Sequence, residues 1–223
     1  MMELIPKIKK AFRTNLLPGI VLWIFGTSLI LGYYYLSPVQ IFLDRMASLK
    51  DAYGFLFSFV SMGLFAGFIP AFVATIIGHI PKHRRFQDII FYTIFWSYKG
   101  MEIDLLYRIQ VVLFGEGSDF LTLTYKTIVD QFVYMPLIAT IPLLILYRWK
   151  DLDYKTHKVV GQLKTKAFWA QVPLVVISCW IVWIPAVYMI YWFPPSLQLA
   201  IANLIECFWA LMLIVLTGSN TDN

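Results

Sequence analysis

Four charged side chains stand within residues 89–114, a stretch of the chain that is otherwise mostly apolar. They are Lys99, Glu102, Asp104 and Arg108. Residues three or four apart share a helix face, so the spacing pairs Lys99 with Glu102 and Asp104 with Arg108. Charged groups at bilayer depth are costly, which makes them candidates for a functional site. Two interpretations stay open: two neutral ion pairs that stabilise a helix bundle, or polar groups that line a solute pathway.

The helical period separates these two pairs. At 100° per residue, the Lys99–Glu102 pair lies about 160–170° around the helix from the Asp104–Arg108 pair. On a straight helix, one pair therefore lines a cavity while the other contacts a neighbouring helix, unless Gly100 bends the chain between them. We favour Asp104 and Arg108 facing inward, because Tyr107 shares their side.

A second polar group stands near the start of a segment that contains two prolines. Asp130 and Gln131 precede Pro136 and Pro142, and Lys126, four residues before Asp130, is spaced to neutralise it. Each proline frees a backbone carbonyl, which needs a hydrogen-bond donor inside a membrane. Gln131 or an arginine is a source of that donor. The pattern predicts either a polar clamp between helices or the lining of a pathway.

Glu206 lies midway along the last apolar segment and has no basic residue near it in sequence. An ionised Glu206 needs Lys99, Arg108 or an equivalent cation from another segment. Without one, burial favours the neutral carboxylic acid. A hydrogen bond between helices is the plainer alternative.

Several kinds of chemistry are not indicated by the sequence. Glu102 and Asp104 are two residues apart and point to different helix faces, and there is no nucleophile motif, metal-ligand cluster or phosphate-binding glycine loop. Pro81 breaks the helix that would align His79 with His83. We therefore predict no catalytic residues, no metal and no cofactor. The two cysteines, Cys179 and Cys207, both lie in apolar segments, which argues against a disulfide framework.

The composition identifies the elements that carry these residues as membrane helices. Of 223 residues, 60% are hydrophobic and only 14% are charged, with a mean hydropathy of +0.71. At about 20 residues per crossing, the apolar blocks predict six spans, and at least four. These are residues 18–36, 52–78, 89–114, 127–147, 168–191 and 196–216. We predict an all-α, polytopic helix bundle with several proline kinks, one membrane-embedded domain over residues 1–223, and a frayed tail at 218–223.

The second apolar segment carries small residues at steps of four. Gly63, Gly67 and Ala71 fall along one helix face, the arrangement that membrane helices use for close backbone contact. We predict that this face packs against another helix, either within the chain, in a second copy of it, or in a partner protein.

The basic residues predict the orientation of the spans. With six spans, one side of the membrane has four Lys/Arg in residues 1–13, three in 79–88 and six in 148–166, thirteen in all, whereas the other has three. This bias predicts that both termini lie on the positive, cytoplasm-like side. It also explains the net charge of +5 without nucleic acid as a partner. The first apolar segment is too long for a signal peptide, so we predict that it is retained.

A short motif in the fourth segment resembles a known family. Lys126, Asp130, Gln131 and Pro136 match, without a gap, the signature of the Mpv-seventeen/peroxisomal-membrane-protein family. Further positions that echo the family's order are Gly100, Tyr107, Trp180, Trp183, Pro185, Pro194 and Trp209. Ile184 is an insertion relative to the family's Trp-Pro, and Gln198 stands where the family has arginine. The resemblance covers about residues 100–216 and indicates a divergent member.

The resemblance implies a compact helical membrane bundle without a bound cofactor, acting as a weakly selective pore or a component of metabolite transport. It implies an inner mitochondrial or peroxisomal membrane, while the absence of organelle signals fits a bacterial inner membrane equally well. The expected partners are the lipid bilayer, small solutes, and a second copy or another membrane helix. The alternative is a structural or assembly protein that packs with partner helices and neither transports nor catalyses.

For the transport hypothesis, we predict that four residues converge on one hydrated cavity between the third, fourth and sixth segments. They are Asp104, Arg108, Asp130 and Glu206. Three acids against one base would favour cations or neutral solutes. The basic loops at the cavity's positive-side mouth would favour anions, so selectivity stays open.

Overall fold

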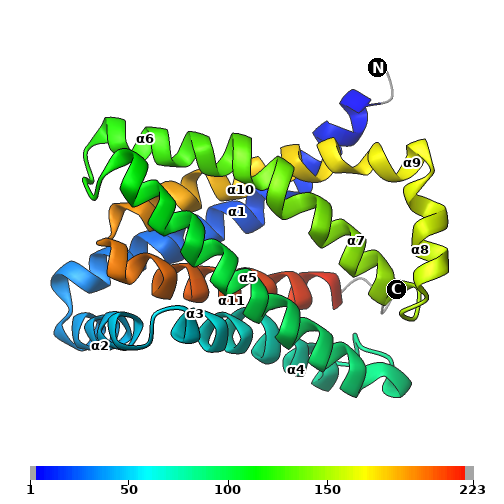
Figure 1. The fold of residues 1–223 in the computed structure, drawn as a ribbon, viewed down its shortest axis with the longest axis horizontal. Helices are drawn as coiled ribbons and strands as arrows, with labels where there is room; N and C mark the ends of the chain where they lie inside the picture. Colours follow the sequence, from blue (N-terminus) through cyan, green and yellow to red (C-terminus); the bar gives the residue numbers. More distant parts are fainter. Residues whose placement is uncertain (1–3, 219–223) are drawn as a thin grey trace.

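The computed structural model describes the backbone of residues 4–218 and the side chains of residues 15–214. Every regular element in this part of the chain is helical (Figure 1), as predicted. In chain order the elements are α1 (Leu4–Tyr35), α2 (Ser37–Tyr53), α3 (Phe55–Met62), η1 (Gly63–Phe68), α4 (Ile69–Ile76), η2 (Lys82–Arg84), α5 (Arg85–Phe114), α6 (Phe120–Val129), η3 (Asp130–Ala139), α7 (Thr140–Asp151), α8 (Thr156–Leu163), α9 (Lys166–Trp169), α10 (Gln171–Trp192) and α11 (Pro195–Gly218). Of the predicted frayed tail, only Gly218 is described, and it ends α11.

Five helical stretches in the described chain are long and apolar enough to cross a membrane. They are Asn15–Tyr35, Phe55–Ile76, Phe120–Asp151, Lys166–Trp192 and Pro195–Ile214. Each corresponds to a predicted segment. The remaining predicted span falls on α5, which has 30 residues but carries the four charges noted above. Five of the six predicted spans are thus helices that could cross a membrane, by length and apolar composition.

Two segments predicted as polar connections contain helices instead. α2 follows α1 directly, with Pro38 in its first turn, and it ends at Gly54, whose φ of +53° suits a residue without Cβ. α8 and α9 occupy most of the basic stretch that follows α7. α2 has a direct consequence for the polar groups, because it brings Lys50 against α5.

Two of the membrane-length stretches contain π-helical turns. η1 interrupts the second stretch just before Pro70, and η3 begins at Asp130 and contains Pro136. The Thr140 hydroxyl donates to the carbonyl of Met135 at 2.8 Å, and the Trp180 indole donates to the carbonyl of Gln131 at 2.7 Å. The expectation that the Gln131 side chain would supply a donor to a carbonyl freed by proline is wrong. Its amide nitrogen donates to Asp130 instead, at 2.8 Å.

The small-residue face of the second stretch packs against α5 of the same chain. A Cβ on Gly63 would clash with Ser97, and one on Gly67 would lie 2.7 Å from the backbone oxygen of Tyr92. A Cβ on Gly100 of α5 would likewise clash with the backbone oxygen of Ser58. Ala71, the third small residue, is buried near Ile80. The predicted packing role of Gly63 and Gly67 is therefore fulfilled inside the molecule, and this face is not free for a partner helix.

The main hydrophobic core lies where α1, α10 and α11 meet. Leu22, Ala186 and Ile201 are fully buried there. The Trp23 indole donates to the carbonyl of Val182 at 3.0 Å, and the rings of Phe25 and Phe208 stack with centroids 4.3 Å apart. These contacts join the first membrane-length stretch to the last two, so residues far apart in the sequence form one packed centre.

The long helices run back and forth between two ends of the molecule. Figure 1 shows α2, the turn between α5 and α6, and the turn between α10 and α11 at the left end. The turn before α5, the segment α8 and the end of α11 lie at the right end. α5 thus runs the length of the bundle like the five apolar stretches.

Candidate functional site

A mainly apolar cavity with several polar side chains in its wall lies inside the bundle, between η3, α5, α10 and α11. Its volume is about 180 Å³. The polar or ionisable side chains that line it include Lys99, Tyr107, Asp130, Gln131, Tyr134 and Glu206. Most other lining residues are apolar, such as Trp96, Leu143 and Val187. We call this space the inner cavity.

Asp130 is at the centre of a hydrogen-bond chain on one wall of the inner cavity. Its carboxylate accepts from the Tyr191 hydroxyl at 2.6 Å and from the side-chain amide of Gln131 at 2.8 Å. Gln110 of α5 donates in turn to the Tyr191 oxygen at 2.7 Å. Asp130, Gln131, Gln110 and Tyr191 are all buried, so this chain ties η3 to α10 and α5. The arrangement fits a polar clamp between helices, and Asp130 and Gln131 also line the inner cavity.

Lys126 does not pair with Asp130, contrary to the sequence expectation. Its ammonium group is buried and has no hydrogen-bond acceptor among residues 15–214. It lies over the ring of Tyr191, 5.9 Å from the centroid, where a cation is attracted by the ring's π electrons. Tyr191 and Gln131 donate to the two carboxylate oxygens of Asp130 instead.

Lys99 enters the inner cavity from α5 together with its predicted partner. Its ammonium group pairs with Glu102 and donates to the Tyr134 hydroxyl at 3.0 Å, and that hydroxyl donates to Glu102 at 2.6 Å. The triangle joins α5 to η3. Because Glu102 already neutralises Lys99, the remaining carboxyl groups at the cavity have no dedicated cation.

Glu206 of α11 faces the inner cavity without a polar partner. No other side chain in the described part of the chain makes a hydrogen bond or an ion pair with it. The other polar groups of α11 are used for packing: Asn203 donates to the Ser61 hydroxyl at 2.8 Å, and Gln198 donates to the carbonyl of Phe193 at 3.0 Å. Glu206 is therefore available to a molecule inside the cavity.

Asp104 lies at a different place, in a cluster of its own. It accepts from Lys50 of α2 and from the Ser58 hydroxyl, both at 2.6 Å, and from its predicted partner Arg108 at 3.1 Å. Asp104 and Lys50 are buried, whereas half of the Arg108 side chain is exposed. These groups line a second pocket of about 360 Å³, together with Asp51, Tyr107 and the first residues of α11. We call this pocket the vestibule.

The predicted convergence of four charges on one cavity is wrong. Asp130 and Glu206 line the inner cavity, but Asp104 and Arg108 line the vestibule. α5 is a continuous helix, so its two ion pairs stay on opposite faces, as the helical period requires. The pair that reaches the inner cavity is the one with Lys99, which corrects our preference for Asp104 and Arg108.

Tyr107 lines both the inner cavity and the vestibule. It is buried, and its ring meets that of Tyr191 edge to face with centroids 5.3 Å apart. Tyr191 is itself fixed by Asp130 and Gln110. The Tyr107 side chain therefore stands in the wall between the two polar spaces.

Several residues of these sites were missed by the sequence analysis. Lys50, Ser58, Tyr134 and Tyr191 each bond to a predicted residue more than 30 positions away, and Gln110 bonds to Tyr191. The one available signal was Gln110, a polar residue in an apolar block. Lys50 gave no such signal, because a lysine in a connecting segment is ordinary.

Fold and site together define an all-α protein with five helices able to cross a membrane and, within the bundle, a mainly apolar cavity with several polar side chains in its wall. Comparison of the chain with protein-family models, with curated proteins and with solved structures finds no match. The resemblance to the Mpv-seventeen family therefore stays a prediction.

Proposed function

We propose that this chain is a six-span integral membrane protein that passes small solutes through the inner cavity, as a weakly selective pore or a transporter component. In this proposal α5 is the sixth span, with its charges turned toward protein partners. The observation that carries the proposal is Glu206, a carboxyl group that faces a cavity inside the bundle and has no hydrogen-bond or ion-pair partner among the described residues. An ionisable side chain is energetically costly within a membrane, so its presence there favours a functional role.

The charges around the inner cavity favour neutral or cationic solutes. Lys99 is paired with Glu102, which leaves the two lining carboxyl groups of Asp130 and Glu206 without a cation of their own. A cavity lined mainly by one sign of charge concentrates solutes of the opposite sign and repels those of the same sign. Its volume limits the solute to a small molecule or ion.

Passage between the inner cavity and the vestibule requires the Tyr107 ring to move, since it stands between them. In the vestibule, Lys50 and Arg108 balance Asp51 and Asp104. It therefore offers a polar entrance with little net charge. The proposed route runs from the vestibule, past Tyr107, to the carboxyl groups of the inner cavity.

We also propose that the chain is a divergent member of the Mpv-seventeen/peroxisomal-membrane-protein family. Residues that carry the resemblance come from three separate segments and gather around Tyr191. Tyr107 and Lys126 lie against its ring, and Asp130 accepts a hydrogen bond from its hydroxyl. Trp180 adds its bond to the Gln131 carbonyl. A common location for these positions supports a shared structural or functional constraint.

For orientation, we propose that both termini lie on the positive side of the membrane, from the bias of thirteen to three basic residues. The host membrane in this proposal is a bacterial inner membrane or an organelle membrane of the mitochondrial inner or peroxisomal type.

The test is solute flux into liposomes that contain the purified protein. Glu206→Gln removes the unpartnered carboxyl group while keeping its shape, and we expect it to reduce flux of small cations about tenfold or more without loss of folded protein. Asp151→Asn, a half-exposed position outside both polar spaces, is the matched control and should leave flux unchanged. Wild-type flux equal to that of empty liposomes, for every solute tested, would rule out the proposal.

A structural or assembly role is the second candidate, and the hydrogen-bond chain around Asp130 favours it. If that chain serves only to clamp η3 to α10, Asp130→Asn should lower folding yield and thermal stability together, with no separate effect on flux. The partner helix of such an assembly would have to use a surface other than Gly63 and Gly67, because α5 covers them.

A further inference from the structure

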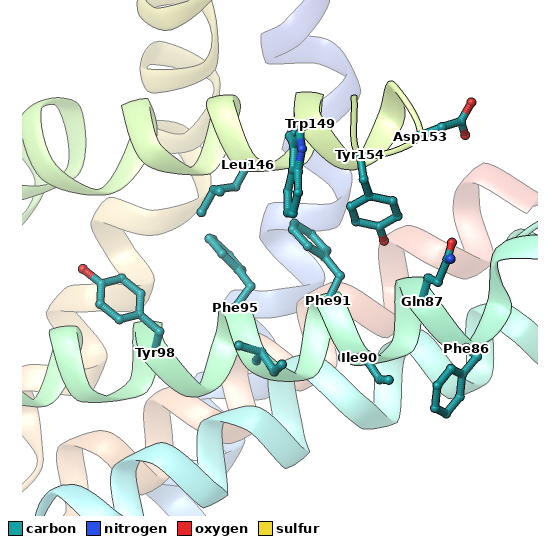
Figure 2. A pocket seen from close by; sticks show the side chains of 11 residues that line it. Phe86, Gln87, Ile90, Phe91, Phe95, Tyr98, Leu146, Trp149, Asp153 and Tyr154 are labelled. Atoms are coloured by element: carbon teal, nitrogen blue, oxygen red, sulfur yellow. The ribbon is translucent and has the colours of Figure 1, made fainter. Parts of the chain in front are cut away.

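A groove of about 640 Å³ lies between α5 and α7 and shares no lining residue with the inner cavity. Figure 2 shows Phe91 and Phe95 pointing from α5 toward Leu146 and Trp149 on α7. Its lining residues Ile94 and Tyr98 are more than half exposed, so the groove opens on the outer surface of the bundle. Its volume falls within the range of small-molecule sites, about 300–1,000 Å³.

The walls of the groove are held in place by contacts of their own. The Phe91 ring lies 6.4 Å from Trp149 and 6.0 Å from Tyr154, and the last two meet edge to face at 5.0 Å. At the same end, Arg84 donates to Asp153 at 2.6 Å and the Tyr154 hydroxyl donates to Asp88 at 2.8 Å. The groove is thus a preformed site, which lowers the entropic cost of binding.

The groove has a polar end and a long apolar part. Gln87, Asp153 and Tyr154 lie at one end, and isoleucine and phenylalanine side chains line the rest (Figure 2). The indole nitrogen of Trp149 is buried and has no acceptor among residues 15–214. From Phe86 to Tyr98 the helix rises about 18 Å at 1.5 Å per residue. One leaflet of a membrane's hydrocarbon core is about 15 Å thick, half of about 30 Å. The groove therefore matches an acyl chain in length and polarity.

The charge around the polar end complements an anionic headgroup. Residues 79–88 and 148–158, which the Arg84–Asp153 and Tyr154–Asp88 bonds join, contain seven Lys/Arg and three Asp. Basic clusters at the membrane surface attract anionic lipids. The two segments with this excess of four cations meet at the polar end of the groove, where Arg84 neutralises Asp153, the one charged residue of the lining.

We propose that the groove between α5 and α7 binds one anionic phospholipid, with an acyl chain along Ile90, Phe91 and Phe95. The phosphate lies at the end marked by Gln87 and Tyr154. This proposal does not depend on solute conduction through the inner cavity.

The test is a titration of the full-length protein in detergent with phosphatidylglycerol and, separately, with phosphatidylcholine, and the bound lipids are counted by native mass spectrometry. We expect one phosphatidylglycerol to bind about tenfold more tightly than phosphatidylcholine. Ile90→Trp fills the groove and should weaken this binding about tenfold. Ile20→Trp is the matched control on α1, since Ile20 and Ile90 are each 39% exposed, and it should bind like the wild type.

A second measurement covers the case in which Ile90→Trp does not fold. The fluorescence of Trp149 is identified as the component of the protein's tryptophan emission that Trp149→Phe removes. Phosphatidylglycerol with brominated acyl chains, present at low mole fraction in phosphatidylcholine, should quench this component. Brominated phosphatidylcholine at the same fraction should quench that component several-fold less. Equal quenching by the two lipids, or equal loss of binding in Ile90→Trp and Ile20→Trp, would overturn the proposal.

Discussion

Asp104 shows how one buried carboxylate can hold three segments together. Lys50 comes from α2, Ser58 from α3 and Arg108 from the next turn of α5, and each donates to the same side chain. An ion pair removed from water contributes little net stability, but loss of one partner leaves the other charge buried and unpaired. The cluster is therefore sensitive to single substitutions and tolerant of paired ones.

We expect Asp104→Asn to destabilise the protein by about 3–5 kcal/mol, because it leaves the Lys50 ammonium buried without a counter-ion. Lys50→Met should cost less, since Arg108 still neutralises Asp104. The double variant Lys50→Met/Asp104→Leu should recover part of the loss, as measured by unfolding in detergent. Additive losses in the double variant would contradict the coupling.

Tyr191 has a comparable role on the other side of α5. Its hydroxyl accepts a hydrogen bond from Gln110 and donates one to Asp130. Its ring packs against the ring of Tyr107 and, at longer range, lies under the ammonium group of Lys126. One aromatic side chain thus connects Lys126 and Asp130 with the wall of the inner cavity. Tyr191 lies 61 positions from Asp130 in the chain, which explains why no local pattern indicated it.

At the scale of elements, the contact between η1 and α5 has little spare room. The backbones approach so closely at Gly67 that a Cβ would lie 2.8 Å from the Cα of Thr93. Backbone atoms of two packed helices cannot move aside as a flexible side chain can. Close contact of this kind strengthens packing in membranes, where apolar burial from water does not drive association.

We expect Gly67→Ala to lower stability by about 1–3 kcal/mol, the usual cost of overpacking. Gly161→Ala in α8 is the matched control, because nothing lies within 4 Å of its added Cβ. Alanine is the better helix former by about 1 kcal/mol, so the control should be neutral or stabilising. Thermal unfolding in detergent measures both variants, and an unchanged midpoint for Gly67→Ala would place this face against lipid.

The link between η2 and the turn after α7 gives a pH-dependent contact outside the spans. The bond from the Arg84 guanidinium holds the pKa of the Asp153 carboxyl below its usual value. Because the pKa of Asp153 is lower in the folded state, its ionised form adds stability at any pH above the pKa of the unfolded state, near 3.9. This contribution is lost as the pH falls through the pKa of the folded state.

We therefore expect the wild type to be more stable than Asp153→Asn at pH 7, with a difference that shrinks below about pH 4. Arg84→Gln removes the cause of the shift and should abolish the pH dependence of this difference. Thermal midpoints of the wild type and of the single and double variants, measured from pH 7 to pH 3, test this. A difference that stays constant over the whole range would show that Asp153 acts without its charge.

At the scale of the whole molecule, the basic residues and the helix directions lead to the same orientation. The segments with thirteen basic residues and the segments with three fall at opposite ends of the bundle, where these segments are described (Figure 1). α5 must cross the membrane for this alternation to hold. Its charges are compatible with a crossing because Lys99 and Asp104 are buried against other elements.

We expect cysteines at Asp119 and Lys158, both exposed positions, to label from opposite sides of the membrane. The background would carry Cys179→Ser and Cys207→Ser, and a membrane-impermeant maleimide applied before and after permeabilisation would report the side. Labelling of both positions from the same side would reduce the number of crossings and remove α5 from the spans.

The sequence alone determined the helical class and the extent of the long segments, because the length and apolarity of a stretch are local properties of the chain. Predicted and observed stretches agree at most ends to within a few residues, as for 168–191 against Lys166–Trp192. It also determined that Lys99 pairs with Glu102 and Asp104 with Arg108, since one helical turn fixes both distances.

Only the tertiary structure decided which helix faces meet, and therefore which charges share a cavity. Asp130 is bound by Tyr191, 61 positions away, and not by Lys126, which is nearer in sequence. Asp104 is bound by Lys50, 54 positions away, as well as by the nearby Arg108. Such pairings depend on close packing at residues such as Gly63 and Gly67, which sets the rotation of α5 against its neighbours. That rotation turns Lys99 toward the inner cavity and Asp104 toward the vestibule, because two groups on opposite faces of one straight helix must meet different partners.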